Sequence, residues 1–486
     1  MPPLVQPPAG RVPGEVRSSV AALGAILLAL SACRAPVATP PDPVKANLDR
    51  YLDARTALGQ WSGAVLVAAG DREILRRADG YADVEHRVPY RPETRQAVAS
   101  ISKMFTALAA LKLRDRGTIS LDDSLCDHLD ACPEAWRPVT LRHLIHHQSG
   151  IPDYEERLEL GSEAYLALMT APGAPAKILE DAKTRPLAFA PGTDFHYSNT
   201  GYIALAYALE KASGIPFPRL VTETVLEPAG MAHSGVLGTG PRPEDLARGY
   251  TYGDLGWAAL LHGVSLTDGH LHSVPDLALT PPQGDAWLYT TVDDLLRFSR
   301  QLEGGALVPS ALAAEIATAE NGYGAGWFVG RAFERTRMRH NGILPGFVSD
   351  FIRFPDERIT IVLLSNLDRV RLDRIARDVT AIVLGQPYDP PVRGEVIALT
   401  PEQVSRLIGT YVTKDGRTLE VRQEPDYLTA ELKGQYTAGL IPLSPTEMYF
   451  PLGDGKAIFT LGEDGRAAAV NMRYSGEDHV AHRATP

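Results

Sequence analysis

The stretch WSGAVLVAAGDREILRRADGYADV (Trp61–Val84) predicts a pair of strands that precedes a mostly helical region of the chain, and the fold class follows from how this pair is completed. Apolar and polar residues alternate on both sides of the Ala-Gly-Asp turn at 69–71, a pattern typical of a β-hairpin. The position of this hairpin raises the question of which later segments complete its sheet.

Strand-like segments return in the C-terminal half of the sequence. They are GYGAGWFVG (322–330), TRMRHNG (336–342), GFVSDFIRFP (346–355) and RITIVLLSN (358–366). Between the two sets, amphipathic segments such as ALAYALEKASG (204–214) end in the glycine that is typical of helix termini. This order predicts an α+β fold, with an antiparallel sheet closed by segments from both ends, flanked by helices and carrying a helical insert.

The last part of the chain has a different pattern. From about Thr400 the hydrophobic period becomes two, as in RTLEVRQE (417–424) and AIFTLGED (457–464), with turn residues between the segments. Six to eight short strands in this space predict a small all-β barrel, with a sandwich as the alternative. We expect an accessory domain at 400–486 after a linker at 389–399.

The composition of the 486 residues is that of a globular protein. The apolar fraction is 44%, the charged fraction is 22% and the net charge is −11. The sequence contains no basic run, so nucleic acid is excluded as a partner.

The N-terminus predicts export. Arg11 and Arg17 precede the apolar run VAALGAILLALSAC (20–33), which is short for a membrane span and ends in small residues. Its end resembles the bacterial lipobox, which implies a lipoprotein-type signal peptide over 1–33, lipidation of Cys33 and membrane anchoring in the periplasm or cell envelope. A plain secretory signal cut near Ala32 is the alternative. Residues 34–45 are expected to form a Pro-rich tether.

Two further cysteines, Cys126 and Cys132, lie close together in SLCDHLDACPEA. In an oxidising compartment this spacing favours a disulfide bond. Free thiols are the alternative, and a metal pair is less favoured because no second pair of cysteines matches it.

Candidate chemistry starts at VASISKMF (Val98–Phe105), which begins a helix expected from about Ser100 to Asp115. Ser100 and Lys103 are three residues apart and therefore share a helix face. A partly desolvated lysine could deprotonate the serine hydroxyl, and the helix N-terminus favours a developing oxyanion. Alone, this spacing is a common coincidence.

Two more stretches supply polar groups. PGTDFHYSNTGY places Tyr197 and Asn199 two apart, so that in an extended segment both would project into one cleft. MRHNGILPGF places His340 two residues before Gly342, where glycine would let a substrate approach the strand backbone. The alternatives are a buried hydrogen-bonded tyrosine, an N-cap asparagine and an edge histidine.

Other catalytic motifs are missing from the sequence. There is no Gly-x-Ser-x-Gly elbow, no phosphate-binding loop and no His-Glu-x-x-His pair. His143 and His147 are four apart and could ligate a metal, but no carboxylate or cysteine is obviously paired with them. We expect neither a metal nor another cofactor.

In this order, the motifs Ser100/Lys103, Tyr197/Asn199 and His340/Gly342 resemble those of the serine β-lactamase and penicillin-binding family, in the branch of class C β-lactamases, D-alanyl-D-alanine carboxypeptidases and esterases. Connecting phrases such as TLRHLIHHQSGIPDY and YTTVDDLLRF are also similar. The resemblance implies a serine hydrolase domain at 46–388 and a lipocalin-like C-terminal module.

The resemblance also implies roles for the matching residues. Ser100 would form the acyl-enzyme, Lys103 and Tyr197 would share the proton transfer, and Asn199, His340 and Gly342 would bind substrate. The backbone N–H groups of Ser100 and Ile343 would form the oxyanion hole.

The sequence departs from this family at two places. His340 replaces the lysine of true class C β-lactamases, which favours peptidase or esterase activity and leads us to expect activity to fall below about pH 6. Ala286 and Trp287 replace small residues and would narrow a cleft. The irregular segment 244–286 is expected to be a lid or a disordered insertion.

The leading hypothesis is an exported serine hydrolase that cleaves amide or ester bonds of D-amino-acid peptides, small esters or β-lactams, with a small molecule or a peptidoglycan-like molecule as substrate. A β-lactamase is the alternative within the family. A non-catalytic penicillin-binding scaffold is the alternative from another class.

Overall fold

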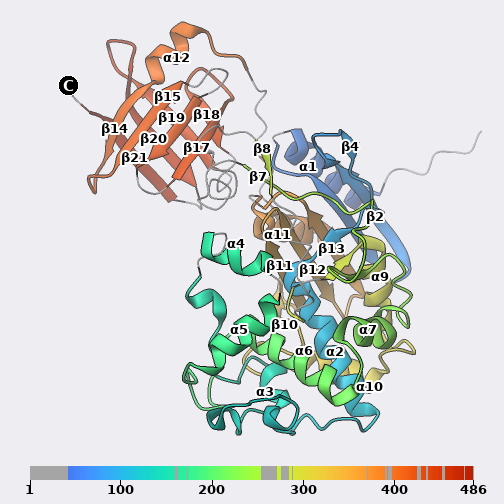
Figure 1. The fold of residues 1–486 in the computed structure, drawn as a ribbon. Helices are drawn as coiled ribbons and strands as arrows, with labels where there is room; N and C mark the ends of the chain where they lie inside the picture. Colours follow the sequence, from blue (N-terminus) through green and yellow to red (C-terminus); the bar gives the residue numbers. More distant parts are fainter. Residues whose placement is uncertain are drawn as a thin grey trace, which may run out of the picture. The chain divides into compact units, whose positions relative to one another are not determined.

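The computed structural model contains a six-stranded sheet with its helices, formed by residues up to 388, and a closed barrel, formed by residues from 397 (Figure 1); these parts are called the main domain and the C-terminal domain. The described residues are 42–484 except 58, 159–162, 172, 253–270, 275–283, 287, 369, 389–390, 392–396, 424–427, 434–435, 451–454 and 475–476.

A six-stranded antiparallel sheet forms the centre of the main domain, in the order β10-β11-β12-β13-β1-β2. The strands are β1 Gly63–Ala69, β2 Arg72–Asp79, β10 Phe328–Ala332, β11 Arg335–Leu344, β12 Phe347–Phe354 and β13 Ile359–Ser365. The hairpin β1–β2 joins the later strands through β13, with Gly63 opposite Ser365. The predicted α+β fold is therefore confirmed.

Helices cover both faces of this sheet (Figure 1). One face packs against α2 Ser102–Asp115 and α9 Val292–Gln301, in a core that also includes α6 Asn199–Ser213, and the other face packs against α1 Pro43–Ala57 and α11 Leu372–Val383. The other helices of the main domain are α3 Leu141–Ile145, α4 Glu163–Thr170, α5 Ala174–Lys183, α7 Phe217–Val221 and α10 Ser310–Ala317. Its short strands are β3 Tyr81–Asp83, β4 Val88–Pro89, β5 Gln96–Ala97, β6 Gly235–Val236, β7 Tyr250–Tyr252, β8 Leu271–Ser273 and β9 Leu288–Thr290.

Strand β1 differs from the alternation that its sequence region predicts. Ala64 and Leu66 belong to the core under α2, whereas Val65 and Val67 belong to the core under α1 and α11. Both faces of the strand are buried, because helices cover both sides of the sheet. A central strand in this position is apolar throughout instead of alternating.

The C-terminal domain is a closed antiparallel barrel of eight strands, which confirms the predicted barrel. A short helix, α12 Pro401–Leu407, precedes it. The strands are β14 Gly409–Thr413, β15 Thr418–Gln423, β16 Leu428–Leu432, β17 Tyr436–Pro442, β18 Glu447–Phe450, β19 Gly455–Leu461, β20 Ala467–Tyr474 and β21 Glu477–Arg483. Closure comes from the pairing of β14 with β21, and inward side chains such as Tyr411, Met448 and Phe459 are buried.

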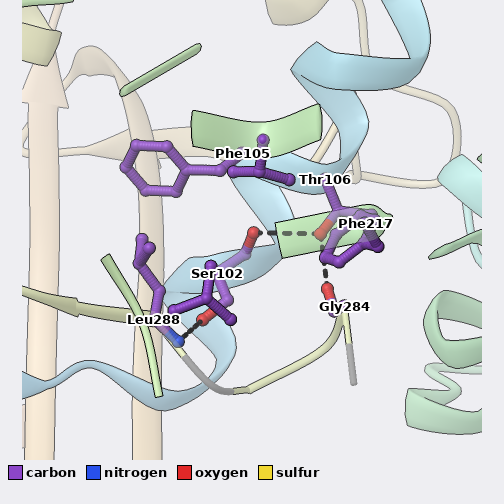
Figure 2. A pocket seen from close by; sticks show the side chains of 8 residues that line it. Ser102, Phe105, Thr106, Phe217, Gly284 and Leu288 are labelled. Carbon is purple, nitrogen blue, oxygen red and sulfur yellow. Dashed lines mark hydrogen bonds between the residues drawn. The ribbon is translucent and has the colours of Figure 1, made fainter. Parts of the chain in front are cut away.

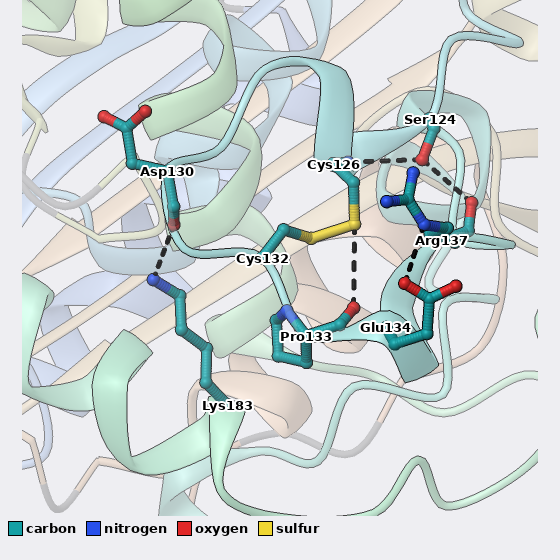
Figure 3. Close-up of a disulfide and its surroundings, with 8 residues drawn as sticks. All are labelled: Ser124, Cys126, Asp130, Cys132, Pro133, Glu134, Arg137 and Lys183. Atoms are coloured by element: carbon teal, nitrogen blue, oxygen red, sulfur yellow. Dashed lines mark hydrogen bonds and ion pairs between the residues drawn. A yellow bond between two sulfur atoms is a disulfide. The ribbon is translucent and has the colours of Figure 1, made fainter.

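A disulfide bond joins Cys126 to Cys132 (Figure 3). The small loop that it closes is tied to α5, because Lys183 Nζ donates to the main-chain oxygen of Asp130 at 2.9 Å. Both cysteines are partly buried against the main core. The pairing is the one favoured by the sequence spacing.

The predicted signal peptide, including Cys33, lies outside the described residues. Helix α1 begins at Pro43, so the last three positions of the predicted tether are helical. The predicted lid at 244–286 lies mostly outside the described residues, but its described part includes the paired strands β7 and β8. Within the described ranges, no helix is both long enough and apolar enough to cross a bilayer.

Candidate active site

Ser100 lies in a tight turn that leads directly into α2. The turn is a 3-10 helix over Ala99–Ile101, and α2 starts at Ser102. Ala99 has φ of +50°, a left-handed conformation that non-glycine residues seldom adopt and that often occurs at functional sites. The turn leaves Ser100 partly exposed at the N-terminal end of α2 while its chain neighbours are buried.

Lys103 contacts the Ser100 hydroxyl. Its Nζ lies 3.0 Å from Ser100 Oγ, 2.8 Å from Asn199 Oδ1 and 3.1 Å from the main-chain oxygen of Asp285. The side chain is completely buried, and three oxygen acceptors match the three N–H bonds of an ammonium group. The lysine is therefore held in one position beside the hydroxyl.

Tyr197 and Asn199 project toward the same place, as the sequence predicts. The Tyr197 ring centre lies 5.0 Å from Lys103 Nζ. Burial raises the pKa of its phenol, while the Lys103 charge and hydrogen bonding with Lys103 and Ser100 oppose the rise. Asn199 is not an N-cap, because the Ser198 hydroxyl caps α6 by accepting from the Gly201 N–H at 3.0 Å.

Ser102, the second serine of VASISKMF, has a structural role. The Ser102 hydroxyl donates to the Ala99 carbonyl at 2.6 Å and accepts from the Leu288 N–H at 3.0 Å. Figure 2 shows the Ser102–Leu288 contact and the Thr106 hydroxyl donating to the Gly284 carbonyl, at a small apolar cavity of about 20 Å³. Through Thr106 and Lys103, α2 holds the main chain of residues 284–285.

His340 lies on β11 and faces this site, but it is almost completely buried. Its Nδ1 donates to the Asn341 carbonyl at 2.7 Å, so its Nε2 accepts from the Tyr323 hydroxyl at 3.1 Å. Burial and the Lys103 charge lower the pKa of His340 to about 3. The prediction that its titration lowers activity below about pH 6 is therefore wrong, since the imidazole is neutral well below that pH.

Gly342 makes a close packing contact that no other residue would allow. A Cβ at this position would lie 2.1 Å from the Val98 carbonyl oxygen and 3.0 Å from the Ala99 side chain. Glycine therefore allows β11 to pack closely against the turn that carries Ser100, and its role in substrate approach stays a prediction. Ile343, whose N–H we predict in the oxyanion hole, is 53% exposed and lines the cavity beside Ser100.

His147 packs against the ring of Tyr197. Its ring centre is 4.2 Å from that of Tyr197, and its Nδ1 accepts from the Ser198 N–H at 3.0 Å. His143 belongs to the capping box that starts α3. In the described part of the chain, no group of three or more His, Cys, Asp or Glu side chains could hold a metal ion.

A cavity of about 310 Å³ opens beside Ser100. Its lining includes Tyr197, Asn199, His340 and Ala286, whereas Trp287 lies outside the described residues. Aromatic, apolar and acidic side chains complete the described wall: Tyr154, Glu155, Tyr165, Asp285, Asn341, Phe328 and Leu344.

The sequence predictions missed the acidic residues of this site. Asp153 accepts from the N–H groups of Glu155 and Asn199, and it therefore fixes the start of α6. Asp285 is completely buried, and burial raises its pKa to about 7 against the lowering effect of Lys103. The three acids of GIPDYEE were the available signal for Asp153 and Glu155, but no local pattern distinguishes Asp285.

Asp285→Asn is expected to change how stability depends on pH. The folded-state pKa of about 7 exceeds the ordinary 3.8, so only the folded state holds the proton between these values. Relative to the variant, wild type should lose stability as pH rises from about 4 to about 7. Above about pH 7 the difference in stability between the two proteins should stay constant. Raised pKa values of Asp153 and Glu155 act in the same direction, but both proteins retain those residues.

Thermal unfolding at pH 4.5, 5.5, 6.5 and 7.5 checks this prediction. Melting curves that shift in parallel for the two proteins, or a variant that is less stable at pH 7.5, would contradict it.

Comparisons with known proteins agree with this geometry. The family model described as beta-lactamase matches residues 48–384. Penicillin-binding protein 4* of Bacillus subtilis (strain 168) is 30% identical over 441 residues, which cover 87% of this chain and 95% of that protein. A D-aminopeptidase of Gluconobacter oxydans (strain 621H) is 27% identical, with coverage of 90% of this chain and 79% of that protein.

Two more relatives show how widely the similarity extends. Esterase EstB of Burkholderia gladioli is 32% identical over 315 residues, which cover 59% of this chain and 78% of that protein. The crystal structure of a penicillin binding protein from Bacillus halodurans aligns with a TM-score of 0.58 and 26% identity, covering 68% of this chain and 99% of that one. By sequence and by fold, this chain is a serine hydrolase and belongs to the beta-lactamase family.

Proposed function

We propose that this protein hydrolyses amide or ester bonds of D-amino acid substrates through an acyl-enzyme on Ser100. The observation that carries the proposal is the contact of Lys103 Nζ with Ser100 Oγ, while Tyr197 and Asn199 line the same cavity. The names of two relatives, a D-aminopeptidase and an esterase, support this substrate class.

In the proposed acylation step, Ser100 Oγ bonds to the substrate carbonyl carbon and loses its proton. Lys103 Nζ and the Tyr197 phenol are the titratable groups beside that oxygen, and they pass the proton to the departing amine or alcohol. The N–H groups of Ser100 and Ile343 stabilise the oxyanion. Water then attacks the ester carbonyl, and its proton returns to Ser100.

Asn199 and His340 are assigned supporting roles in this proposal. Asn199 holds Lys103 through a 2.8 Å hydrogen bond. His340 presents a neutral, buried ring to the cavity, and so it supplies no positive charge for a substrate carboxylate. This feature favours peptidase or esterase activity over that of a β-lactamase, because penicillins carry a carboxylate.

We also propose that the protein is exported to the periplasm or cell envelope and anchored to the membrane through lipidated Cys33. Peptidoglycan-like molecules are available in that location. The apolar run ending at Cys33 and the Cys126–Cys132 disulfide support this location, since disulfides persist in oxidising compartments. Release of Cys33→Ser from the membrane fraction, with wild type retained, is the expected result. Equal distribution of the two proteins between the membrane and soluble fractions would contradict lipid anchoring at Cys33.

A substrate panel tests the proposed activity. We expect D-alanine p-nitroanilide to be hydrolysed with a kcat/KM at least about 10-fold above that of the L-enantiomer, and p-nitrophenyl acetate to be turned over as well. Nitrocefin should be hydrolysed slowly or only label the enzyme. A preference for the L-substrate would refute the D-amino acid assignment, and nitrocefin as the best substrate would establish a β-lactamase. Labelling without turnover of any substrate would indicate a penicillin-binding scaffold.

A further inference from the structure

We propose that the carboxylates of Asp285 and Glu155 form a subsite for a cationic group of the substrate, the free α-ammonium of a D-amino acid amide or ester. This inference rests on the proposed function, because it specifies which substrates enter the cavity beside Ser100. The subsite would favour substrates with a free amino group over N-acylated and anionic substrates.

The first observation is the state of the Asp285 carboxylate. The residue is completely buried and lines the cavity, yet neither carboxylate oxygen has a hydrogen-bond partner among the described residues. Contacts of α2 fix its backbone instead, through the carbonyls of Gly284 and Asp285. A buried carboxylate without a hydrogen-bond partner lowers stability. A ligand with N–H donors would supply the missing hydrogen bonds to the Asp285 oxygens.

The second observation locates this carboxylate on the aromatic side of the cavity. Tyr154, Tyr165 and Tyr197 line the same cavity as Asp285; burial is the main cause of the raised pKa of each phenol, and the Asp285 charge adds to the rise. The charges of Asp285 and Glu155 also act on one another. Aromatic rings around two acids suit an ammonium group, which is attracted to carboxylates and to ring faces.

Glu155 supplies the second carboxylate. It is exposed, it lines the same cavity, and it accepts from the Tyr154 hydroxyl at 3.3 Å. The neighbouring Asp153 is less suitable for a ligand, because its oxygens accept from the main-chain N–H groups of Glu155 and Asn199. Asp285 and Glu155 are therefore the acids that the substrate can reach.

The third observation is the shortage of positive charge for an anionic substrate. The described lining includes no lysine or arginine, and the adjacent Lys103 directs its Nζ to three oxygen atoms. The ring of His340 is neutral. The sequence from 249 to 296, which contains Asp285, has neither lysine nor arginine. A substrate carboxylate would thus meet two acids and no available cation.

Matched substrates and variants test the subsite. The kcat/KM for D-alanine p-nitroanilide is compared with that for N-acetyl-D-alanine p-nitroanilide, which has the same scissile bond but no charge. In wild type we expect a ratio of at least about 10, and in Asp285→Asn a fall of about 10- to 100-fold in that ratio, mainly through KM. Glu155→Gln should lower it by a smaller factor.

Glu156→Gln is the matched control. Its carboxylate is one residue from Glu155 but pairs with Arg185 and His196. Glutamine preserves its capping hydrogen bond to the Asp153 N–H, so the ratio should stay at the wild-type value. Thermal unfolding of Asp285→Asn at pH 7.5 shows whether that variant folds, and we expect a melting temperature at or above that of wild type.

The outcomes separate the subsite from the proposed function. A wild-type ratio near or below one, with p-nitrophenyl acetate still hydrolysed, overturns the subsite and leaves the hydrolase standing. Equal losses for both p-nitroanilides in Asp285→Asn also overturn it, because they indicate a structural role only. If wild type hydrolyses nothing, calorimetry of Ser100→Ala decides: tighter binding of D-alanine amide than of its N-acetyl form supports the subsite, and equal binding refutes it.

Discussion

Ser100→Ala is expected to lower kcat/KM for p-nitrophenyl acetate and for D-alanine p-nitroanilide by roughly 10⁴- to 10⁶-fold. The hydroxyl is the atom that bonds to the substrate, and removal of a catalytic serine leaves only binding and oxyanion stabilisation. Such a loss corresponds to about 5–8 kcal/mol of transition-state stabilisation. Steady-state rates of the purified variant measure it.

Ser102→Ala is the control for this variant, because the two serines share one short segment. Ser102 is buried and its hydroxyl bonds to the Ala99 carbonyl and the Leu288 N–H. Its removal should lower the melting temperature and reduce activity far less than Ser100→Ala. Equal losses in the two variants, or residual activity in Ser100→Ala within 10-fold of wild type, would contradict Ser100 as the nucleophile.

Lys103→Met is expected to reduce kcat by about 10³-fold, within the range for loss of a group that moves a proton. Methionine preserves much of the side-chain volume but supplies no N–H donor. The substitution leaves Asn199 Oδ1 and the Asp285 carbonyl without the donor that they now share. We therefore also expect a lower melting temperature, since unpaired buried acceptors are costly.

The same change at Lys112 separates catalysis from helix stability. Lys112 lies on α2 as well, and its Nζ donates to the Leu307 carbonyl at 2.8 Å, away from Ser100. Lys112→Met should keep kcat within about 3-fold of wild type while losing one hydrogen bond. If Lys103→Met keeps comparable activity, the assignment of Lys103 to proton transfer is wrong.

Local patterns in the sequence predicted much of this molecule. The strands at both ends join in one sheet, because β1 pairs with β13, and the barrel follows from the period of two after Thr400. Ser100 and Lys103 meet because residues three apart share a helix face, and this requires no long-range information.

Features that depend on distant segments could not be predicted. Asp285 lies 182 residues after Lys103 in the sequence, and the hydrogen bond from Lys103 to its main-chain oxygen joins it to α2. The burial of His340 against Tyr323, and hence its low pKa, comes from the packed β11. The close approach of β11 to the turn before Ser100, which requires glycine at position 342, was likewise not visible from the local sequence.

Acid-quenched mass spectrometry during turnover of p-nitrophenyl acetate tests the central claim most directly. Trypsin should release the peptide Gln96–Lys103, which contains both Ser100 and Ser102, and fragmentation distinguishes the two serines. We predict one acetyl group on Ser100, formed in wild type and missing in Ser100→Ala. An acetyl group on Ser102 or elsewhere, or turnover that leaves this peptide unmodified, would contradict the account.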